Sequence, residues 1–253
     1  MQNTYRTIWI SDVHLGSQNA KAEFLIDFLL HNHCEKLYLV GDIIDGWRLQ
    51  SKFHWPDSHQ NVVTQVLDIA RAGVEVIYLT GNHDDFLRRV SEYKLAFGNI
   101  KILDEIVHET VDGRKLLVIH GDKFDVVTRY HKWVSLLGDY IYGILIWVNR
   151  YFNHVRKWFG YEYWSLSSYI KLKVKSAVNI ISNFEDSLVH ECEKQDLQGV
   201  VCGHIHKAEM KDMRGKLYCN SGDWVESCTA LVEHGDGELE IVHWVGSQKQ
   251  GKK

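Results

Sequence analysis

Five short clusters of Asp, His and Asn hold the side chains of this sequence that are best suited to catalytic chemistry. Each follows a short apolar run, and the clusters are Asp12-Val13-His14, Gly41-Asp42-Ile43-Ile44-Asp45, Gly81-Asn82-His83-Asp84, His120-Gly121-Asp122 and Gly203-His204-Ile205-His206. Their donor atoms are carboxylate oxygens, imidazole nitrogens and one amide oxygen, without a thiolate. This donor set suits Mn, Fe or Zn. The clusters therefore predict a metal centre.

The spacing within the clusters indicates how these ligands would be presented. Asp12 and His14 are two residues apart, as are His204 and His206, so each pair would point to one side of an extended segment. Asp42 is the natural bridging ligand, because one carboxylate can offer an oxygen to each of two ions. Two ions roughly 3.5–4 Å apart clamp the attacking and leaving oxygens of an in-line displacement and lower the pKa of bound water. Such a centre suits hydrolysis of a phosphorus ester, whose developing charge must be neutralised.

Each of these residues, taken alone, also has a structural explanation. Asp12 and Asp42 could cap helices, Asn82 could occupy a turn, and the histidines could be loop or packing residues. We prefer the metal centre because these explanations would have to hold for all five clusters at once. A choice between orienting a ligand histidine and simple capping stays open for Asp84, Asp85 and Asp122.

The elements that would position the clusters can be read from the alternation of apolar runs and amphipathic stretches. Strands are expected at residues 7–10, 36–40 and 74–79, with helices at residues 22–32 and 61–72. Later strands are expected at residues 102–107, 115–119, 199–202 and 216–219, and a last hairpin at residues 230–233 and 238–244. This order predicts an α/β fold with parallel strands. Ligands of such sheets bind at the carboxyl ends of strands, so the clusters should converge at one edge.

The bulk composition excludes several classes of protein. The chain has 253 residues, of which 45% are hydrophobic, and a formal net charge of −4, so it is neither disordered nor marked as a nucleic-acid binder. Five cysteines without a CxxC pair argue against a disulfide framework and for a reducing compartment. No secretory signal is visible. We therefore expect a cytoplasmic enzyme with no nucleic-acid partner and no obligate protein partner.

Residues 123–175 differ from the rest of the chain. They hold 14 aromatic residues and nine Lys or Arg against three Asp or Glu. We interpret residues 123–198 as a helical insertion between core segments 1–122 and 199–247, with 248–253 as a flexible tail. The aromatics could form only a small core of a helical cap. Alternatively, they could line the apolar, basic groove of a lid that binds an amphiphilic phosphorylated substrate and touches an anionic membrane surface.

The five clusters, in this order, resemble those of the calcineurin-like metallophosphoesterases. The resemblance implies a metallophosphoesterase-type β-sandwich flanked by helices, in α/β/β/α layers, with the insertion as its lid. It implies a metal-dependent hydrolase that uses two divalent ions, for which we expect Mn, with Fe or Zn as alternatives. By this resemblance one ion would be held by Asp12, His14, Asp42 and His206, and the other by Asp42, Asn82, His120 and His204.

The resemblance also implies two catalytic roles and a branch of the family. His83 would contact the phosphate as proton donor or transition-state stabiliser, and Asp45 would orient it. The chain looks most like the UDP-2,3-diacylglucosamine pyrophosphatases of lipid A synthesis, because Trp47 closely follows the second cluster and the late segment 220–224 reads Asn-Ser-Gly-Asp-Trp. Well-studied members of that branch carry Arg and Glu at the positions of His83 and Asp45, so this chain keeps the pair of the wider family.

This branch implies hydrolysis of a UDP-sugar pyrophosphate to UMP and a diacylglucosamine 1-phosphate, by an enzyme peripheral to the cytoplasmic face of the inner membrane. Besides Asn82 and His83, helical spacing makes four insertion residues candidates for binding the substrate: Ser165, Ser168, Lys171 and Lys175. The alternatives are another phosphodiester, pyrophosphate or phosphomonoester substrate, or a non-catalytic phosphoprotein-binding module.

Overall fold

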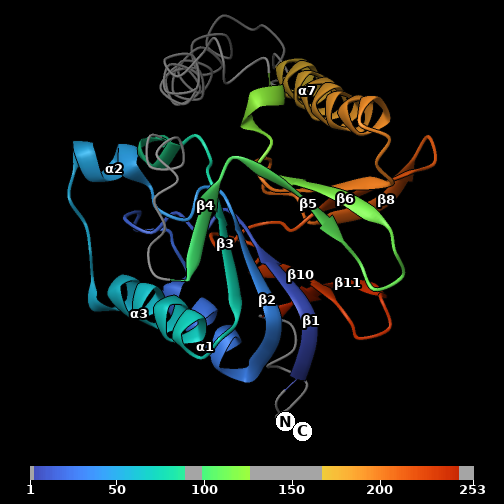
Figure 1. The fold of residues 1–253 in the computed structure, drawn as a ribbon. Coiled ribbons are helices and arrows are strands. Elements are labelled where there is room, and N and C mark those ends of the chain that lie inside the picture. The colour runs from blue at the N-terminus through green and yellow to red at the C-terminus, as the bar shows by residue number, and fades with distance from the viewer. Residues whose placement is uncertain (1–2, 89–98, 126–166, 245–253) are drawn as a thin grey trace, which may run out of the picture. The chain divides into compact units, whose positions relative to one another are not determined.

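The computed structural model of the chain describes residues 3–88, 99–125 and 167–244 (Figure 1). The chain divides into two compact units, Met1–Asp122 with Leu188–Lys253, and Lys123–Ser187. The second unit begins at the residue predicted to open the insertion and ends before residue 198. The predicted tail, residues 248–253, lies outside the described residues.

Within the described ranges, no helix combines the length and the hydrophobicity needed to cross a bilayer. The most hydrophobic window of the sequence, residues 134–152, lies outside these ranges.

The first unit contains a six-stranded sheet whose order is β11-β10-β1-β2-β3-β4. Its parallel strands are β1 (Asn3–Ile10), β2 (Asn32–Val40), β3 (Glu75–Leu79) and β4 (Ile100–Leu103). On the other side of β1, β10 (Thr229–Glu233) and β11 (Leu239–His243) continue the sheet with antiparallel pairing. Helices α1 (Ala22–His31) and α3 (Asp57–Arg71) connect the parallel strands.

Both faces of this sheet are buried. Ile8 and Ile10 of β1 pack in one cluster with the apolar faces of α1 and α3, whereas Trp9 between them packs in a second cluster with residues of the other sheet. Tyr38 of β2 and Ile77 of β3 join Trp9 in that second cluster. Because successive side chains of a strand point to opposite faces, a strand covered on both sides needs a continuous apolar run. That run is what the sequence shows.

The second sheet has five strands in the order β5-β6-β7-β9-β8. They are β5 (Glu105–Glu109), β6 (Lys115–Ile119), β7 (Gly199–Cys202), β8 (Glu209–Met213) and β9 (Lys216–Asn220). Its outer face is also buried, and the last turns of α7 (Ser167–Lys194) reach it, since the Cys192 thiol donates to the Gly199 carbonyl at 3.3 Å. The expected fold class, two packed sheets with helices on their outer faces, is confirmed.

One predicted strand is wrong. Residues 102–107 form two strands that belong to different sheets, because the chain leaves β4 at Leu103 and enters β5 at Glu105. The residue between them, Asp104, accepts a hydrogen bond from the Thr80 hydroxyl at 2.5 Å, and the Thr80 N–H donates to the Leu103 carbonyl. These bonds close the end of β4 on β3 and turn the chain towards the second sheet.

Short or polar elements were not predicted. α2 (Gly46–Ser51) is a six-residue helix, and β8 is an edge strand whose side chains are half-buried or exposed. Neither carries an apolar period long enough to be recognised. Two single-turn helices lie beside the clusters: η1 (Asp85–Leu87) follows the third, and η2 (Asp122–Phe124) begins at the last residue of the fourth.

Candidate metal centre

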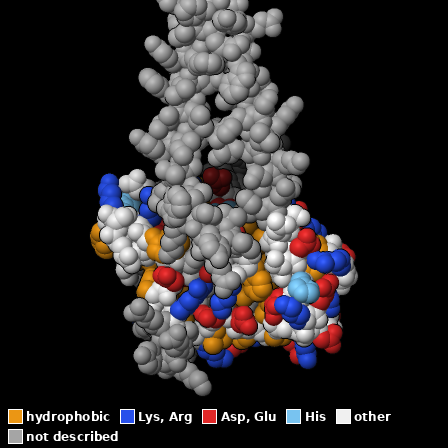
Figure 2. Space-filling view, turned by 90° about the horizontal axis from the view of Figure 1, so that it is seen from above, with side chains coloured by type: hydrophobic (Ala, Val, Ile, Leu, Met, Phe, Trp, Pro, Cys, Tyr) orange, Lys and Arg blue, Asp and Glu red, His pale blue; other side chains and the backbone are white. Residues whose placement is uncertain are grey.

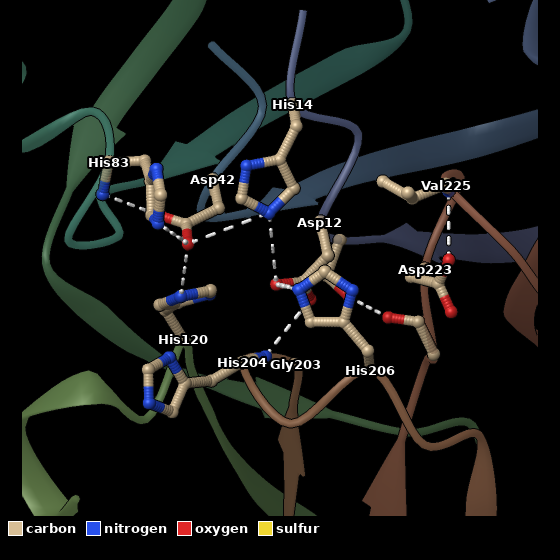
Figure 3. Close-up of polar contacts among 12 residues, drawn as sticks. Asp12, His14, Asp42, His83, His120, Gly203, His204, His206, Asp223 and Val225 are labelled. Atoms are coloured by element: carbon tan, nitrogen blue, oxygen red, sulfur yellow. Dashed lines mark hydrogen bonds and ion pairs between the residues drawn. The ribbon is translucent and has the colours of Figure 1, made fainter. Parts of the chain in front are cut away.

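The predicted ligands lie where strands of both sheets end, and Figure 3 shows several of them pointing towards one another. β1 leads into Asp12 and His14, β2 into Asp42, β3 into Asn82, β6 into His120, and β7 into His204 and His206. The strand-to-loop transitions therefore bring residues from most of the chain length to one place.

The loops that follow β1 and β2 are joined through their backbones. The N–H of Asp12 donates to the Gly41 carbonyl at 3.1 Å, and the N–H of His14 donates to the Asp42 carbonyl at 2.9 Å. The parallel pairing of the two strands thus continues past their ends. It holds the first pair of predicted ligands beside the predicted bridging carboxylate.

Five predicted ligands adopt the left-handed backbone conformation that residues other than glycine rarely take. Their φ angles are 53° for Asp12, His14 and His206, 54° for Asp42 and 73° for His204. Such conformations cost about 1–3 kcal/mol each and cluster at functional sites. The loops therefore keep unfavourable backbone conformations in which these side chains point towards one another.

Among the residues that the structure describes, three groups of side chains have potential ligand atoms within 4.8 Å of one another: Asp12 with His14 and His206, Asp42 with His120 and His204, and His14 with Asp42 and His83. The first two groups lie within the two sets of ligands implied by the family resemblance. Asp42 Oδ2 lies 3.3 Å from Nε2 of His120 and 3.9 Å from Nε2 of His14, which places it between the sets.

The donor atoms fit a cation. Four atoms of predicted ligands are buried without a hydrogen-bond partner: Oδ1 of Asp12, Nε2 of His14, Oδ1 of Asn82 and Nε2 of His120. Leaving such an atom unsatisfied costs about 1–3 kcal/mol. A metal ion satisfies carboxylate, amide and imidazole lone pairs together, so these residues fit the expected ions.

Both carboxylates are oriented by backbone hydrogen bonds. Oδ2 of Asp12 accepts from the His204 N–H at 2.9 Å, and Oδ1 of Asp42 accepts from the His83 N–H at 2.8 Å. Each carboxylate thus uses one oxygen to hold a neighbouring loop and turns the other towards the imidazoles. Similarly, Nδ1 of His120 contacts the Val40 carbonyl at 2.9 Å, which leaves Nε2 for an ion. Such contacts fix the ring orientation of a ligand histidine.

Two glycines are required by the closeness of these loops. A Cβ on Gly81 would overlap the Asp42 carboxylate, and a Cβ on Gly203 would lie 2.5 Å from Oδ2 of Asp12. The glycine in each motif therefore removes an obstacle directly beside a predicted ligand.

His83 is held from two sides. Its Nδ1 lies 3.0 Å from Oδ1 of Asp45, and its ring packs on Trp47 with centroids 4.0 Å apart and an angle of 33° between the planes. Asp45 also caps α2 by accepting from the Arg48 N–H at 2.9 Å. Nε2 of His83 lies 4.0 Å from Oδ2 of Asp42, on the side of the metal centre. In the sequence Trp47 was only a feature shared with the family branch, whereas the structure shows its ring in contact with His83.

The charges of the centre are strongly coupled. Burial alone would raise the pKa of Asp42, but His120, His83 and His14 lower it well below its usual range. Burial alone would lower the pKa of His120, yet Asp42 above all raises it to about 10. The two shifts together favour an ionised Asp42 beside a His120 that carries a proton. A bound metal would displace that proton.

Asp84 positions the loops and does not merely cap a helix. It is fully buried and accepts from the Ile43 N–H at 3.0 Å, the Gly81 N–H at 2.5 Å and the Tyr78 hydroxyl at 2.6 Å. Burial and the neighbouring Asp42 raise its pKa to about 6. It links the loop after β2 to the loop after β3. Asp122, for which the same choice of roles was open, instead pairs with the Arg88 guanidinium at 2.7 Å.

The predicted substrate-binding residues of the insertion stay predictions. Ser165 lies outside the described residues. Ser168, Lys171 and Lys175 belong to the first half of α7, where the structure describes the backbone but not the side chains.

Comparison with known proteins agrees with this geometry. The family model described as Calcineurin-like phosphoesterase matches residues 5–208. Similar proteins include the UDP-2,3-diacylglucosamine hydrolase of Psychromonas ingrahamii, 23% identical over 227 residues that cover 87% of this chain and 89% of that protein. The hydrolase of the same name from Chromohalobacter salexigens is 30% identical over 141 residues, 50% of this chain and 55% of the relative.

Among solved structures, vacuolar protein sorting 29 from Cryptosporidium parvum aligns with a TM-score of 0.46 and 11% identity, over 93% of this chain and 94% of that one. The match of the family model over most of the chain identifies the family. The chain belongs to the calcineurin-like phosphoesterases, and it is a metal-dependent hydrolase of phosphorus ester or anhydride bonds.

Proposed function

We propose that this enzyme hydrolyses the pyrophosphate bond of UDP-2,3-diacylglucosamine and releases UMP and 2,3-diacylglucosamine 1-phosphate for lipid A synthesis. The observation that carries the metal-dependent hydrolysis is the pair of neighbouring ligand groups on either side of Asp42, with four buried donor atoms that lack a hydrogen-bond partner. The relatives named UDP-2,3-diacylglucosamine hydrolase support the substrate, because the alignment to the Aliivibrio fischeri protein covers 90% of this chain and 94% of the relative.

Two divalent ions bound here would neutralise the charge that develops on the phosphate and lower the pKa of the attacking water. The protein's own contribution is positioning. Asp45 holds Nδ1 of His83, so Nε2 faces the centre and can donate a proton or a hydrogen bond to the leaving oxygen. We propose Mn as the metal, with Fe and Zn as alternatives, because the donors are oxygen and imidazole nitrogen.

The proposed substrate is a glycolipid, which calls for a site beside a membrane. We propose that the aromatic and basic residues of the predicted insertion, 123–198, bind the acyl chains and contact the cytoplasmic face of the inner membrane without crossing it. We expect no nucleic-acid substrate. On the face shown in Figure 2, basic and acidic side chains of the described residues are intermixed, and they do not form a continuous basic surface.

A second candidate is hydrolysis of a simpler phosphodiester, pyrophosphate or phosphomonoester. The contact between His83 and Asp45 favours it, because this is the catalytic pair of the wider family and not the Arg and Glu of the lipid A branch.

Product analysis separates the two candidates. Purified enzyme with Mn²⁺ should release UMP from UDP-2,3-diacylglucosamine, and Asp42→Ala should release none. If UMP does not appear while a soluble model diester is cleaved, the lipid substrate is wrong and the second candidate stands.

A further inference from the structure

A buried histidine outside the metal centre holds the end of a ligand loop. His59, on α3, is 2% exposed, and its Nδ1 accepts a hydrogen bond of 3.0 Å from the N–H of Gly16. Gly16 stands two residues after His14. His59 does not belong to any of the five clusters, and its position in the sequence gives no sign of this contact.

The contact completes a chain of hydrogen bonds that begins at the strands. Beyond His14, the Leu15 N–H donates to the Ile43 carbonyl at 2.8 Å, and the Asp45 N–H returns to the Leu15 carbonyl at 2.8 Å. These bonds keep the loop after β1 in register with the loop after β2. At Gly16 the chain turns away with a φ of 104°, and the Gly16 N–H donates to Nδ1 of His59.

The loop end is also confined sterically. A Cβ on Gly16 would lie 2.8 Å from Cγ of Leu49 on α2, so the backbone at this turn sits against one helix and is hydrogen-bonded to another. A shift of Gly16 would be transmitted to His14, whose backbone already has a left-handed φ of 53°. The backbone segment that carries Asp12 and His14 is therefore fixed at its far end by the turn at Gly16.

We propose that His59 is a positioning residue of the metal centre, which holds Gly16 and thereby sets the directions of Asp12 and His14. The inference rests on the dinuclear site proposed above. It requires a neutral imidazole with its proton on Nε2, because Nδ1 accepts from Gly16. Burial and the adjacent His54 lower the pKa of His59, against a smaller opposing effect of Glu23, and so favour that form.

Two substitutions separate the hydrogen bond from the packing of the ring. His59→Phe keeps a ring of similar size but leaves Gly16 without its acceptor. His59→Asn places an amide oxygen close to the former position of Nδ1 and can still accept from Gly16. Residues that support metal ligands typically contribute about 10–100-fold to metal affinity. We expect His59→Phe to weaken Mn²⁺ binding by about tenfold, at the low end of that range, and His59→Asn to bind close to wild type.

The experiment measures Mn²⁺ affinity of the full-length, chelator-stripped protein by titration calorimetry, so it needs no substrate. His108→Phe is the matched control. His108 is also 2% exposed, but its partners are Tyr38 and Glu233 and not a ligand loop. This control should lower the melting temperature without changing Mn²⁺ affinity. If His59→Phe does not fold, His59→Gln, which carries its acceptor further from the backbone, replaces it and should bind weakly.

Wild-type Mn²⁺ affinity in folded His59→Phe or His59→Gln would overturn the inference. Equal weakening in His59→Asn would also overturn it, because packing and not the hydrogen bond would then be responsible. Absence of Mn²⁺ binding by the wild type would overturn the dinuclear site and this inference with it. Failure to release UMP would leave the inference standing.

Discussion

Asp42 and His83 lie in contact yet have different predicted tasks. Asp42 presents Oδ2 to imidazoles of both ligand groups, whereas His83 is anchored by Asp45 and Trp47 and only borders the centre. The side chain of His83 is 24% exposed, against 3% for Asp42, so His83 is the one of the two that an incoming substrate can reach. Substitutions at the two positions should therefore fail in distinguishable ways.

Asp42→Ala is expected to lose both ions, because it removes the carboxylate that lies between the two groups. Metal content measured by mass spectrometry should fall from two ions per chain to nearly none. Asp68→Ala, which removes an exposed carboxylate of α3 paired with Arg71, should keep both ions. Two ions retained in Asp42→Ala would contradict a bridging role.

His83→Ala is expected to lower kcat by about 10²–10⁴-fold, the usual contribution of a general acid or base. Its metal content should stay near that of the wild type, since the backbone N–H that orients Asp42 is kept. Steady-state kinetics and metal analysis of the same preparation check both points. Loss of metal would instead show that His83 is a ligand, as its group with His14 and Asp42 would allow.

At the scale of elements, the centre depends on where strands stop. β1, β2 and β3 run parallel, and glycines at the ends of β2 and β3 let the following loops approach closely. Asp84 accepts from backbone N–H groups of the loops after β2 and β3, and His59 accepts from the N–H of Gly16 in the loop after β1. The ligand positions are thus set by the sheet and its supporting residues together.

Gly81→Ala tests this close approach. The added Cβ would overlap the Asp42 carboxylate and its backbone nitrogen, so we expect about 1–3 kcal/mol of destabilisation, as for other overpacked sites, and weaker metal binding. Gly235→Ala is the matched control, because a Cβ there has no neighbour within 4 Å. Urea unfolding and Mn²⁺ titration measure the two effects. Equal behaviour of the two variants would show that the loops can separate without harm.

At the scale of the whole core, a buried carboxylate ties the two sheets together. Glu233 of β10 accepts from the Arg6 guanidinium at 2.7 Å, the Thr7 hydroxyl at 2.8 Å and the Val111 N–H at 2.8 Å, and lies 3.1 Å from Nε2 of His108 on β5. Because β10 and β5 belong to different sheets, this network helps to hold the sandwich closed.

The network predicts an acid-dependent stability. Burial alone would raise the pKa of Glu233, but its hydrogen-bond donors lower it to about 2. A carboxylate with a depressed folded pKa stabilises the protein above its unfolded pKa of about 4.3, and this contribution disappears as the pH falls towards 2. It is on the order of 3 kcal/mol. Urea unfolding of wild type and Glu233→Gln should therefore differ most above pH 4.3, whereas parallel curves would contradict the role.

Metal removal should also destabilise the core, because the ions bind only the folded arrangement. Metal at a hundredfold excess over Kd contributes about 2.7 kcal/mol, or roughly 5–10 °C in Tm for a domain of this size. Calorimetry with and without a chelator measures the shift, which Mn²⁺ should reverse. An unchanged Tm in a preparation shown to hold metal would count against a centre built into the fold.

The two-sheet sandwich was expected from the family resemblance. The α/β class with parallel strands, and Asp12, Asp42, Asn82 and His120 as candidate ligands, came from the sequence itself, because each of these residues follows an apolar strand within a short segment. Local patterns carry that information. They also placed α1, α3 and most strands, whose apolar periods reflect burial on one or both faces.

Only the tertiary structure showed the break at Asp104, the ring of Trp47 on His83, the acceptor His59 behind Gly16, and the network around Glu233. Each depends on a contact between residues distant in sequence, which exists only in the packed arrangement of helices and sheets. Local propensity and spacing do not encode which polar atom meets which partner. The register of the strands and the positions of the helices decide it.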